Sequence, residues 1–394
     1  MMKEIILVIN AGSSSLKFKI FDLNHEAIAY GQVEGIDLAP SFKAKDADGN
    51  VIAEYAWGRE DAHNHSMVLG YLVDWITGTF EGYRLRACGH RIVHGGTLFN
   101  ASVLVTDEVV EQIESLIPLA PLHQPHHLRV IKLMKQRYPE LPQVAVFDTA
   151  FHQSMQGNAT MYAIPYELYQ EGVRRYGMHG TSYAYIVHKL QESQSAFADK
   201  RLIVAHIGSG ASLCAINNGK SVMTTMGMTA LDGVCMGTRP GSIDPGILLY
   251  LMENKGYGVD KIREFLYYKS GVGGLSELSS NFYTLECEMA QNEGAKRAYD
   301  FMTYRTAEEI ARLMVSLGGA DAIIFTAGVG ENSAYFRAEV CRQLEYLGVK
   351  IDAQKNQSRN DEVISAPESK IAVLTIPTNE ELMIVLDTIA LTHA

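Results

Sequence analysis

The chain has 394 residues, of which 47% are hydrophobic and 20% are charged, and its formal net charge is −11. This length suits two domains better than a single core. The negative charge argues against nucleic acid as the main partner, because binding to a phosphate backbone needs a basic face. No apolar run approaches the roughly 18 residues of a membrane span. We therefore expect neither nucleic acid nor a membrane as a partner.

The cysteines and the first residues bear on location. Five cysteines are scattered along the chain without Cys-x-x-Cys spacing, and we interpret them as buried, reduced thiols. Met1 to Glu4 lead directly into a strand pattern rather than into a secretory signal peptide. These features predict a cytoplasmic protein.

Two loops rich in glycine and serine lie about half a chain apart. Asn10 to Ser15 joins the β-like runs 5–9 and 16–21, and Gly208 to Ser212 follows the run 202–207. Backbone N–H groups in such turns bind anionic oxygens, and small residues let a phosphate approach. The repeat predicts a duplicated domain with two phosphate-binding loops. Two ordinary tight hairpins are the alternative.

The first half alternates strands with amphipathic helices. Its pattern predicts a helix over 63–79, a strand over 86–93, a helix over 107–117 and a buried strand over 143–147. This alternation predicts α/β architecture with a largely parallel central sheet.

The second half repeats this order. A helix over 303–317 is predicted to end at Gly318 and Gly319, because glycine terminates helices. A strand over 322–326 then leads into a predicted glycine loop, Ala327 to Asn332, and a further helix follows. Strand, glycine loop and helix form the usual layout for a nucleotide at a helix N-terminus. Because no low-complexity linker separates the halves, we expect a hinge between them.

Three basic residues are candidates for contact with an anionic substrate. Arg91 and Arg239 each lie in a predicted glycine-rich turn after a β-like segment. A guanidinium suits carboxylate and phosphoryl oxygens and stays charged in a closed site. Neither loop matches the Walker pattern. Lys17, on the strand after the first loop, either contacts phosphate or lies on a solvated face.

Other polar residues suit a metal-assisted phosphoryl transfer. Asp148 follows a buried strand, where it either holds Mg²⁺ through water or caps the next helix. His179 lies in a glycine-flanked loop before a helix and either donates to developing phosphoryl charge or is structural. Glu380 and Glu381 begin the terminal helix. One of them is a candidate Mg²⁺ ligand, and the other favours the helix dipole.

Taken in chain order, these motifs resemble the acetate kinase family, within the actin/Hsp70/sugar-kinase superfold. The resemblance covers essentially the whole chain. The segments that carry it are Val8–Lys17, Gly89–Gly96, Phe147–His152, Met236–Arg239, Phe325–Ser333 and Pro377–Glu381. It implies reversible, Mg²⁺-dependent phosphoryl transfer from ATP to acetate, giving acetyl phosphate and ADP by direct in-line transfer. It also implies a homodimer and Mn²⁺ as a substitute for Mg²⁺.

The implied fold is α/β, with two duplicated actin-like (ribonuclease H-like) domains flanking a nucleotide cleft. The N-terminal domain would comprise residues 1–148 plus 381–394. The C-terminal, nucleotide-binding domain would comprise residues 149–380.

The resemblance also implies roles for individual residues. Arg91 and Arg239 would clamp the carboxylate and the transferring phosphoryl group, and His179 would stabilise the charge in flight. The implied metal ligands are Asn10, Asp148 and Glu380, and Asn10 and Asp148 also belong to the implied catalytic set.

The implied binding residues form two groups. The substrate group is Arg91, Val93, Leu122, Met178 and Ala230. The nucleotide group is Ser13, Ser15, Lys17, His206, Gly208, Ser209, Gly210, Asn281, Phe282, Tyr283, Gly328, Val329, Gly330 and Asn332.

The chain departs from the family pattern at four places. Met178 replaces the usual Phe and Ala230 replaces the usual Pro, which leaves the acyl-chain preference open. Ser209 replaces Asn, and residues 281–283 (Asn-Phe-Tyr) stand where Asp-x-Arg usually contacts adenosine. These two changes leave the phosphoryl donor open. Retention of the segment 328–332 favours a nucleotide over pyrophosphate.

Three alternatives remain. The nearest is a kinase for propionate or another short-chain carboxylate. A non-catalytic ATP-dependent clamp of the actin/Hsp70 type is disfavoured by the two arginines and by the lack of an appended peptide-binding domain. A hydride-transfer enzyme is disfavoured because Gly-x-Gly-x-x-Gly does not follow the first strand.

Overall fold

The computed structural model describes residues 2–36, 38–58, 64–357 and 362–392. Its contacts divide the chain into two compact units, Met1–Ala150 with Asn379–Ala394 and Phe151–Thr378. These crossing points lie two residues from the expected boundaries. The assignment of exact domain limits stays a prediction, and each unit is described by itself.

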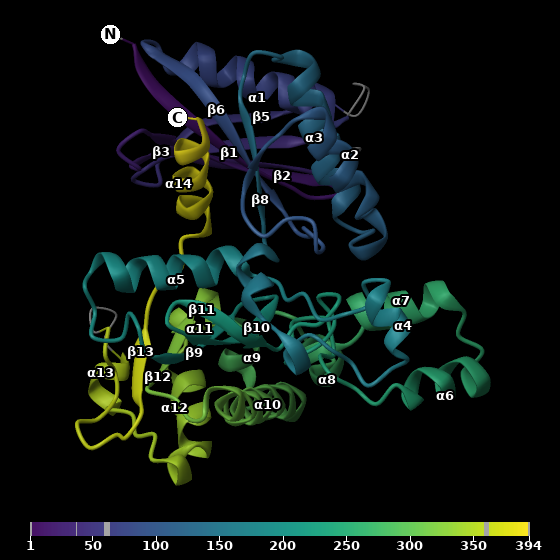
Figure 1. Ribbon diagram of the computed structural model, residues 1–394, viewed down its shortest axis with the longest axis vertical. Helices are drawn as coiled ribbons and strands as arrows, with labels where there is room; N and C mark the ends of the chain where they lie inside the picture. The colour runs from purple at the N-terminus through teal and green to yellow at the C-terminus, as the bar shows by residue number, and fades with distance from the viewer. Residues whose placement is uncertain (1, 37, 59–63, 358–361, 393–394) are drawn as a thin grey trace. The chain divides into compact units, whose positions relative to one another are not determined.

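The first unit is built on a mixed sheet (Figure 1). Within the described residues this sheet has eight strands in the order β5-β4-β3-β2-β1-β6-β8-β7. β1 to β5 pair antiparallel with their sequence neighbours, β1, β6 and β8 pair in parallel, and β7 is antiparallel to β8. The strands are β1 (Lys3–Ala11), β2 (Ser15–Asp22), β3 (Ala27–Glu34), β4 (Ser41–Asp46), β5 (Val51–Ala56), β6 (Tyr83–Ile92), β7 (Val103–Leu104) and β8 (Gln143–Phe147).

Helices pack on both faces of this sheet. They are α1 (His65–Thr79), α2 (Asp107–Ser115), α3 (Gln124–Arg137) and α14 (Glu380–Thr392), and a 3₁₀ turn spans Ile117–Leu119. On β1, Leu7 packs with the core under α1 and α3, and Val8 packs with Ile384 of α14 on the opposite face. Burial on both faces explains why β1 is a continuous apolar run rather than an alternating one.

The second unit contains a sheet with the order β11-β10-β9-β12-β13. Its strands are β9 (Arg201–Ile207), β10 (Ala211–Asn217), β11 (Lys220–Thr224), β12 (Ala322–Thr326) and β13 (Ala372–Thr375). Figure 1 shows α5 and α10 on opposite sides of this sheet. Tyr183 and Ile186 of α5 pack on Val204 of β9, and Ile310 and Leu313 of α10 are fully buried.

The remaining elements of the second unit are mostly helical. They are α4 (Tyr166–Gln170), α5 (Gly180–Glu192), α6 (Gly246–Lys255), α7 (Val259–Tyr268), α8 (Gly271–Ser276), α9 (Phe282–Glu288), α10 (Glu293–Leu317), α11 (Ala327–Asn332), α12 (Ala334–Gln343) and α13 (Ala353–Gln357). Three 3₁₀ turns span Ala150–Ser154, Gly157–Ala159 and Glu345–Leu347.

The two sheets share one strand plan, which supports the predicted duplication. In each, an antiparallel three-stranded meander (β3-β2-β1 and β11-β10-β9) continues into two parallel strands (β6-β8 and β12-β13). Parallel neighbours need a crossover through a helix, so helices cover the faces of both sheets. The predicted α/β architecture is confirmed.

Several predicted elements agree closely with the structure. The strands over 143–147 and 322–326 are confirmed without change. The helix predicted over 63–79 begins at His65 after the Asn64 cap, and residues 59–63 lie outside the described residues. The helix predicted over 107–117 ends at Ser115.

Three local predictions were wrong. Arg91 lies within β6, inside the strand predicted over 86–93, and not in a glycine-rich turn after a strand. Residues 327–332 form helix α11 rather than a loop, and the Glu331 carboxylate accepts the N–H of Ala327 in its first turn. The helix predicted from residue 303 begins ten residues earlier, at Glu293, where the Asn292 side chain caps it by accepting the N–H of Ala295.

The cysteines and helix lengths bear on the expected location. All five cysteines are free; four are buried, but Cys287 is exposed, so the interpretation of five buried thiols is wrong there. Burial raises the pKa of Cys214 and of Cys341 to about 12. Across the described residues, no helix combines the length and apolar character that a membrane span requires.

Candidate active site

Arg91 and Asp148 form the centre of a charged cluster in the first unit. Arg91 pairs with Val146 across the β6–β8 ladder, and Asp148 follows directly after β8. The Arg91 Nε donates to both carboxylate oxygens of Asp148 at 3.1 Å, and Nη2 donates to Oδ2 at 2.7 Å. Parallel pairing therefore brings together two residues that are 57 positions apart in the sequence.

Glu380, at the start of α14, completes this cluster. Its Oε2 lies 3.9 Å from Nη1 of Arg91. Burial raises the pKa of Glu380 to about 7; Arg91 opposes this shift, and the charges of Asp148 and Glu381 add to it. Burial alone would lower the pKa of Arg91, but the charges of Asp148 and Glu380 outweigh it and raise the pKa. The guanidinium stays charged.

The cluster offers oxygen ligands to a cation without forming a closed cage. Mg²⁺ prefers carboxylate, amide and water oxygens, and it usually keeps several waters and substrate phosphates. Asp148 and Glu380 provide such oxygens, although Arg91 engages both oxygens of Asp148. No group of three or more His, Cys, Asp or Glu side chains within the described ranges is placed to hold a metal. The oxygens of Asp148 and Glu380 would suit a Mg²⁺ ion whose shell is completed by water and phosphate, and Mg²⁺ binding here stays a prediction.

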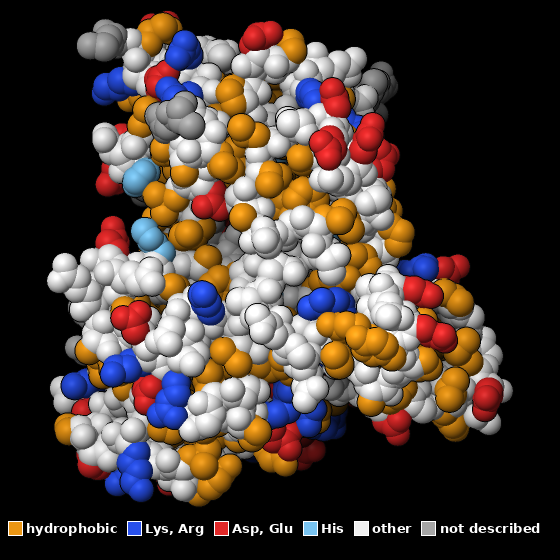
Figure 2. All heavy atoms as spheres, in the orientation of Figure 1, with side chains coloured by type: hydrophobic (Ala, Val, Ile, Leu, Met, Phe, Trp, Pro, Cys, Tyr) orange, Lys and Arg blue, Asp and Glu red, His pale blue; other side chains and the backbone are white. Residues whose placement is uncertain are grey.

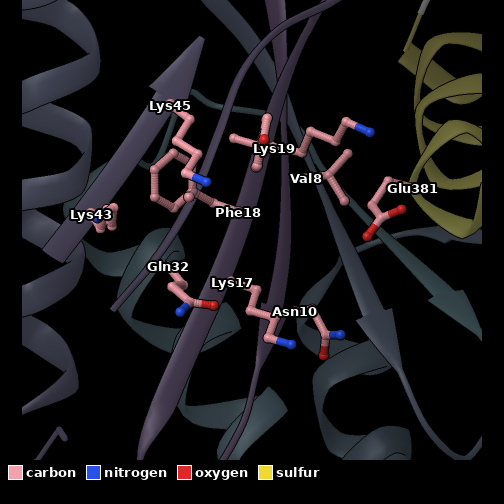
Figure 3. A pocket seen from close by; sticks show the side chains of 11 residues that line it. Val8, Asn10, Lys17, Phe18, Lys19, Gln32, Lys43, Lys45 and Glu381 are labelled. Carbon is pink, nitrogen blue, oxygen red and sulfur yellow. The ribbon is translucent and has the colours of Figure 1, made fainter. Parts of the chain in front are cut away.

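The first glycine and serine loop is the turn of a β-hairpin. Asn10 on β1 faces Lys17 on β2, and the Gly12 N–H donates to the Ser15 carbonyl at 2.7 Å. Ser13 is exposed in the turn. Asn10 and Lys17 line one end of a hollow of about 400 Å³ (Figure 3). Phosphate binding by this turn stays a prediction.

His65 of α1 contacts this turn, and no local sequence pattern predicts this contact. The buried His65 ring places Nε2 3.3 Å from the Gly12 carbonyl oxygen, and the Arg129 Nη1 lies 3.3 Å from its Nδ1. Because a guanidinium only donates, Nδ1 accepts and Nε2–H donates to Gly12.

His179 occupies a constrained position in the second unit. It precedes α5 in the left-handed region, with φ 59°. Its Nδ1 lies 2.9 Å from the Ser212 hydroxyl, which also bonds the Tyr183 hydroxyl. The His206 ring stacks on the His179 ring with 4.2 Å between centroids. The predicted loop position of His179 before a helix is confirmed, and its ring is fixed from two sides.

Arg239 lies beside His179 at the second glycine and serine loop. A side chain added at Gly210 would place Cβ 2.8 Å from the Arg239 Nη2 and 3.5 Å from the His179 Nε2. Arg239 donates from Nη1 to the Ala230 carbonyl at 2.8 Å, and no carboxylate among the described residues pairs with it. Burial lowers its pKa. A half-buried cation that no carboxylate of the described residues neutralises suits an anionic ligand.

A second hollow, of about 290 Å³, opens beside this loop. Eight predicted nucleotide residues line it: Gly208, Ser209, Asn281, Phe282, Tyr283, Gly328, Val329 and Asn332. Ser280, Glu286 and Ser333 also line it and were not predicted. Of the predicted group in this unit, His206, Gly210 and Gly330 do not line the hollow.

These three residues have other positions in the second unit. His206 stacks on His179, and Gly210 makes room for Arg239. Gly330 lies inside α11, where an added Cβ would come within 3.5 Å of the Ala205 carbonyl oxygen. At that distance a Cβ would make an ordinary van der Waals contact, so packing does not require a glycine at this position.

Glu286 is fixed by residues far away in the sequence. Its Oε2 accepts hydrogen bonds from the hydroxyls of Tyr299, at 2.5 Å, and Ser333, at 2.6 Å. These partners come from α10 and from the residue between α11 and α12. The carboxylate is thus positioned at the wall of the hollow, where it can accept a hydrogen bond from a hydroxyl or amino group.

A series of hydrogen bonds connects His206 with Thr378, the last residue of the second unit. The Ser182 hydroxyl lies 2.8 Å from the His206 Nδ1 and 2.8 Å from the Thr378 hydroxyl. Glu331 accepts from the backbone N–H groups of Ala327 and Thr378, at 2.7 and 3.0 Å. These hydrogen bonds therefore link β9, α5 and α11 to Thr378, where the chain leaves this unit.

Comparison with known proteins decides the family. A model of the acetokinase family matches residues 5–386. The chain belongs to the acetokinase family.

Individual relatives agree with this family over nearly their whole length. The acetate kinase of Nitrobacter hamburgensis is 45% identical over 390 residues, which cover 98% of this chain and 96% of that protein. The crystal structure of a propionate kinase from Francisella tularensis has a TM-score of 0.91 at 37% identity, covering 98% of this chain and 100% of that one. That of Porphyromonas gingivalis acetate kinase has a TM-score of 0.90 at 38% identity, covering 98% and 99%. The α/β fold of two duplicated actin-like domains is thereby confirmed.

The departures from the family pattern have distinct surroundings. Asn281 uses its side-chain oxygen to cap α9 at Thr284, and Phe282 is buried. Tyr283 lines the hollow and is 77% exposed. Met178 is buried, and its carbonyl accepts from the His152 Nε2 at 2.9 Å.

The implied substrate pocket draws on both units. Arg91, Val93 and Leu122 belong to the first unit, and Met178 and Ala230 belong to the second. The pocket that would combine these five residues stays a prediction.

Proposed function

We propose that the chain transfers the terminal phosphoryl group of ATP to acetate, reversibly, giving acetyl phosphate and ADP. The observation that carries the proposal is the pair Arg239 and His179 at the Gly208–Gly210 turn, beside the hollow that Gly208 and Ser209 line. A half-buried guanidinium with no carboxylate partner in the described residues is suited to an anion whose charge changes during the reaction. Membership of the acetokinase family supports the same reaction.

The proposed step is a direct displacement. A carboxylate oxygen of acetate forms a bond to the terminal phosphorus of ATP, the bond from that phosphorus to the bridging oxygen breaks, and its electrons stay on ADP. No proton is transferred, so the groups of the chain orient the reactants and neutralise charge.

The proposed role of each side chain agrees with its hydrogen-bond partners. Arg91, held by Asp148, presents a charged guanidinium to the acetate carboxylate and phosphoryl oxygens. If Ser212 donates to the His179 Nδ1, the His179 Nε2–H donates to a phosphoryl oxygen, and Tyr183 supports this by donating to Ser212. The reaction requires the groups of both units to act on one pair of substrates.

The metal belongs to this proposal. Mg²⁺, or Mn²⁺ in its place, would be held by Asp148, Glu380 and Asn10, with phosphate and water oxygens completing its shell. When bound, it would neutralise charge on the phosphate oxygens and orient the phosphoryl chain.

Two further observations favour a propionate kinase as the second candidate. A solved relative with a TM-score of 0.91 is described as a propionate kinase. In this chain, Ala230 and Met178 replace the bulkier Pro and Phe of the family pattern. Both candidates use the same chemistry and differ only in the acyl group.

A hydroxamate assay of acyl phosphate formation tests the proposal. Acetate, propionate and butyrate are each supplied with ATP, GTP or pyrophosphate and with Mg²⁺, and kcat/KM is measured for each pair. Acetate with ATP is expected to give the highest value. Higher values with propionate would favour the second candidate. Phosphate release without acyl phosphate would contradict both candidates and support the clamp alternative.

We further propose a homodimer that forms through α6 and α7. Neither helix has a buried residue, although α6 is largely apolar. Figure 2 shows apolar side chains among the carboxylates on this part of the molecule. The exposed apolar residues are Ile247, Leu249, Tyr250, Met252, Val259 and Tyr268. Such faces usually mark an interface.

We also propose a cytoplasmic location, with which the five free thiols agree.

Light scattering after size-exclusion chromatography tests this interface. A Leu249→Glu, Met252→Glu variant is expected to shift the chain from dimer to monomer. Tyr346→Glu is the control, because Tyr346 is 76% exposed but lies outside α6 and α7. A monomeric wild type, or a dimer unaffected by the double change, would refute this part of the proposal.

A further inference from the structure

One face of the first sheet gathers lysines into a hollow. The sheet register sets two parallel rows across four strands: Asn10, Lys17, Gln32 and Lys43 form one row, and Val8, Lys19, Tyr30 and Lys45 form the other. All of these residues line the hollow of about 400 Å³ shown in Figure 3. Because side chains alternate along a strand, the lysines of β2 and of β4 all point to the same face.

The charge of this hollow is opposite to that of the whole chain. Its lining contains four lysines and one carboxylate, Glu381, although the chain has a net charge of −11. Lys43 pairs with Glu54 of β5, and Lys19 lies over the Phe21 ring, 5.1 Å from its centroid. Among the described residues, no carboxylate pairs with Lys17, Lys19 or Lys45. The hollow therefore carries positive charge that the protein does not itself neutralise.

The spacing of the lysines limits the size of the anion. Two residues on one strand face are about 7 Å apart, and β2 and β4, two strands apart, are separated by about 10 Å. A single orthophosphate cannot contact all of these positions. An anion with charges spread along a chain can do so, and Tyr30 and Gln32 lie between the lysines as further hydrogen-bond donors.

The type of basic side chain in the hollow indicates which class of anion it binds. Arginine suits planar carboxylates because its fork binds both oxygens, whereas lysine acts as a point charge that phosphate accepts from any direction. The hollow is lined by lysines and by no arginine within the described residues. We propose that this face binds a linear oligophosphate, with the Lys19 and Lys45 end as a site separate from the nucleotide hollow of the second unit.

Residues of the proposed active site line only one end of this hollow. Asn10, a Mg²⁺ ligand in the proposed function, and Lys17, which belongs to the nucleotide group implied by the family resemblance, lie together at that end in Figure 3. Lys19 and Lys45 lie in the other row and have no part in the proposed reaction. Binding at this site does not depend on turnover, so it can be tested independently of the kinase activity.

Isothermal titration of the full chain with sodium tripolyphosphate tests the proposal, in EDTA and at about 25 mM and about 200 mM salt. The site variant is Lys19→Gln, Lys45→Gln. The control is Lys132→Gln, Lys135→Gln on α3, which removes the same charge from the helix layer on the opposite face. Thermal unfolding and hydroxamate activity are measured for every variant, and Lys45→Gln alone replaces the double variant if that one does not fold.

The expected result is saturable tripolyphosphate binding that the site variant weakens by at least about tenfold and the control by less than about threefold. Binding should also weaken as salt rises, should exceed that of orthophosphate, and should persist when ADP saturates the nucleotide site. The absence of saturable binding in the wild type, an equal loss in the control, or full displacement by ADP would each overturn the proposal. Normal activity with lost binding would leave the proposed function intact.

Discussion

Arg239 and Arg91 carry the same charge but are held in different ways. Arg239 donates to a backbone carbonyl, and no carboxylate in the described part of the chain pairs with it. Arg91 makes three hydrogen bonds to Asp148, whose side chain is 1% exposed. Loss of Arg239 should therefore affect mainly the reaction, whereas loss of Arg91 should affect the fold as well.

Arg239→Ala is expected to lower kcat by about 10³-fold to 10⁵-fold, the range for charge-neutralising arginines in phosphoryl transfer. The free energy of unfolding should change little, because no buried anion loses its partner. Steady-state kinetics and urea denaturation measure the two effects. Arg342→Ala, at the exposed end of α12, is the control. A folded Arg239→Ala protein with near-normal turnover would remove Arg239 from the mechanism.

Arg91→Ala is expected to lower the free energy of unfolding by about 3–5 kcal/mol, the usual cost when a buried ion pair loses one partner. The reason is that the charge of Asp148 stays buried. Adding Asp148→Asn should recover part of this loss. Urea denaturation of both single variants and the double variant measures the coupling. If the double variant is no more stable than Arg91→Ala, the ion pair is not the cause.

Two residues of the implied substrate pocket should set the acyl preference. Met178 is unbranched and flexible, and Ala230 lacks the ring of the usual Pro, so propionate should be accepted better than in relatives that carry Phe and Pro. One methylene in an apolar pocket is worth about 1–3 kcal/mol. The Met178→Phe, Ala230→Pro variant should therefore raise the acetate-to-propionate ratio of kcat/KM. An unchanged ratio would show that these side chains do not form the wall.

The pairing of β6 with β8 positions the Arg91 cluster and also buries His90. His90, on β6, is 3% exposed, and its Nε2 lies 2.8 Å from the Gln143 Oε1 of β8. Burial lowers the pKa of His90 from 6.5 to about 4, against the opposing hydrogen bond to Gln143. The folded state therefore holds this ring neutral, and this makes the strand pair sensitive to acid.

The sign of the pH effect follows from the lowered pKa. Above pH 6.5 the ring is neutral in both states; as the pH falls towards 4, only the unfolded state takes up the proton, and stability is lost. The difference corresponds to roughly 3 kcal/mol. His90→Asn should therefore flatten the fall in unfolding free energy over this range, whereas His25→Asn, in an exposed turn, should not. Parallel pH profiles for wild type and His90→Asn would refute this assignment.

At the scale of the whole molecule, the chain passes twice between its two compact units, after Ala150 and after Thr378. The second crossing follows Thr378, which is bonded to Ser182 and to Glu331. If both units act on one pair of substrates, they must close around them to exclude water.

Closure should be visible in solution. Adding Mg-ADP, acetate and a transition-state mimic is expected to reduce the radius of gyration measured by small-angle X-ray scattering, with motion about residues 148–152 and 378–381. Arg239→Ala is the matched control and should close less. Identical scattering profiles with and without ligands would count against a hinge at these segments.

The sequence by itself determined the features that depend on neighbouring residues. Apolar runs predicted β8 and β12 without error, and the two glycine and serine turns revealed the repeated hairpin. Local motifs also selected Arg91, Asp148, His179 and Arg239 as candidates, because each stands beside glycines or at a strand or helix end. Such signals are local since backbone conformation and side-chain alternation repeat over a few residues.

Only the tertiary structure decided which residues meet. The sequence could not show that Glu286 lines the hollow of the second unit, because its partners Tyr299 and Ser333 come from distant elements. It could not show the lysine hollow either, since that face exists only when β2, β3 and β4 pair in one register. The glycine segment after β12 becomes helical where Glu331 accepts the N–H groups of Ala327 and Thr378. These contacts join residues from about four to about fifty positions apart, and the register and packing that bring them together are properties of the folded chain.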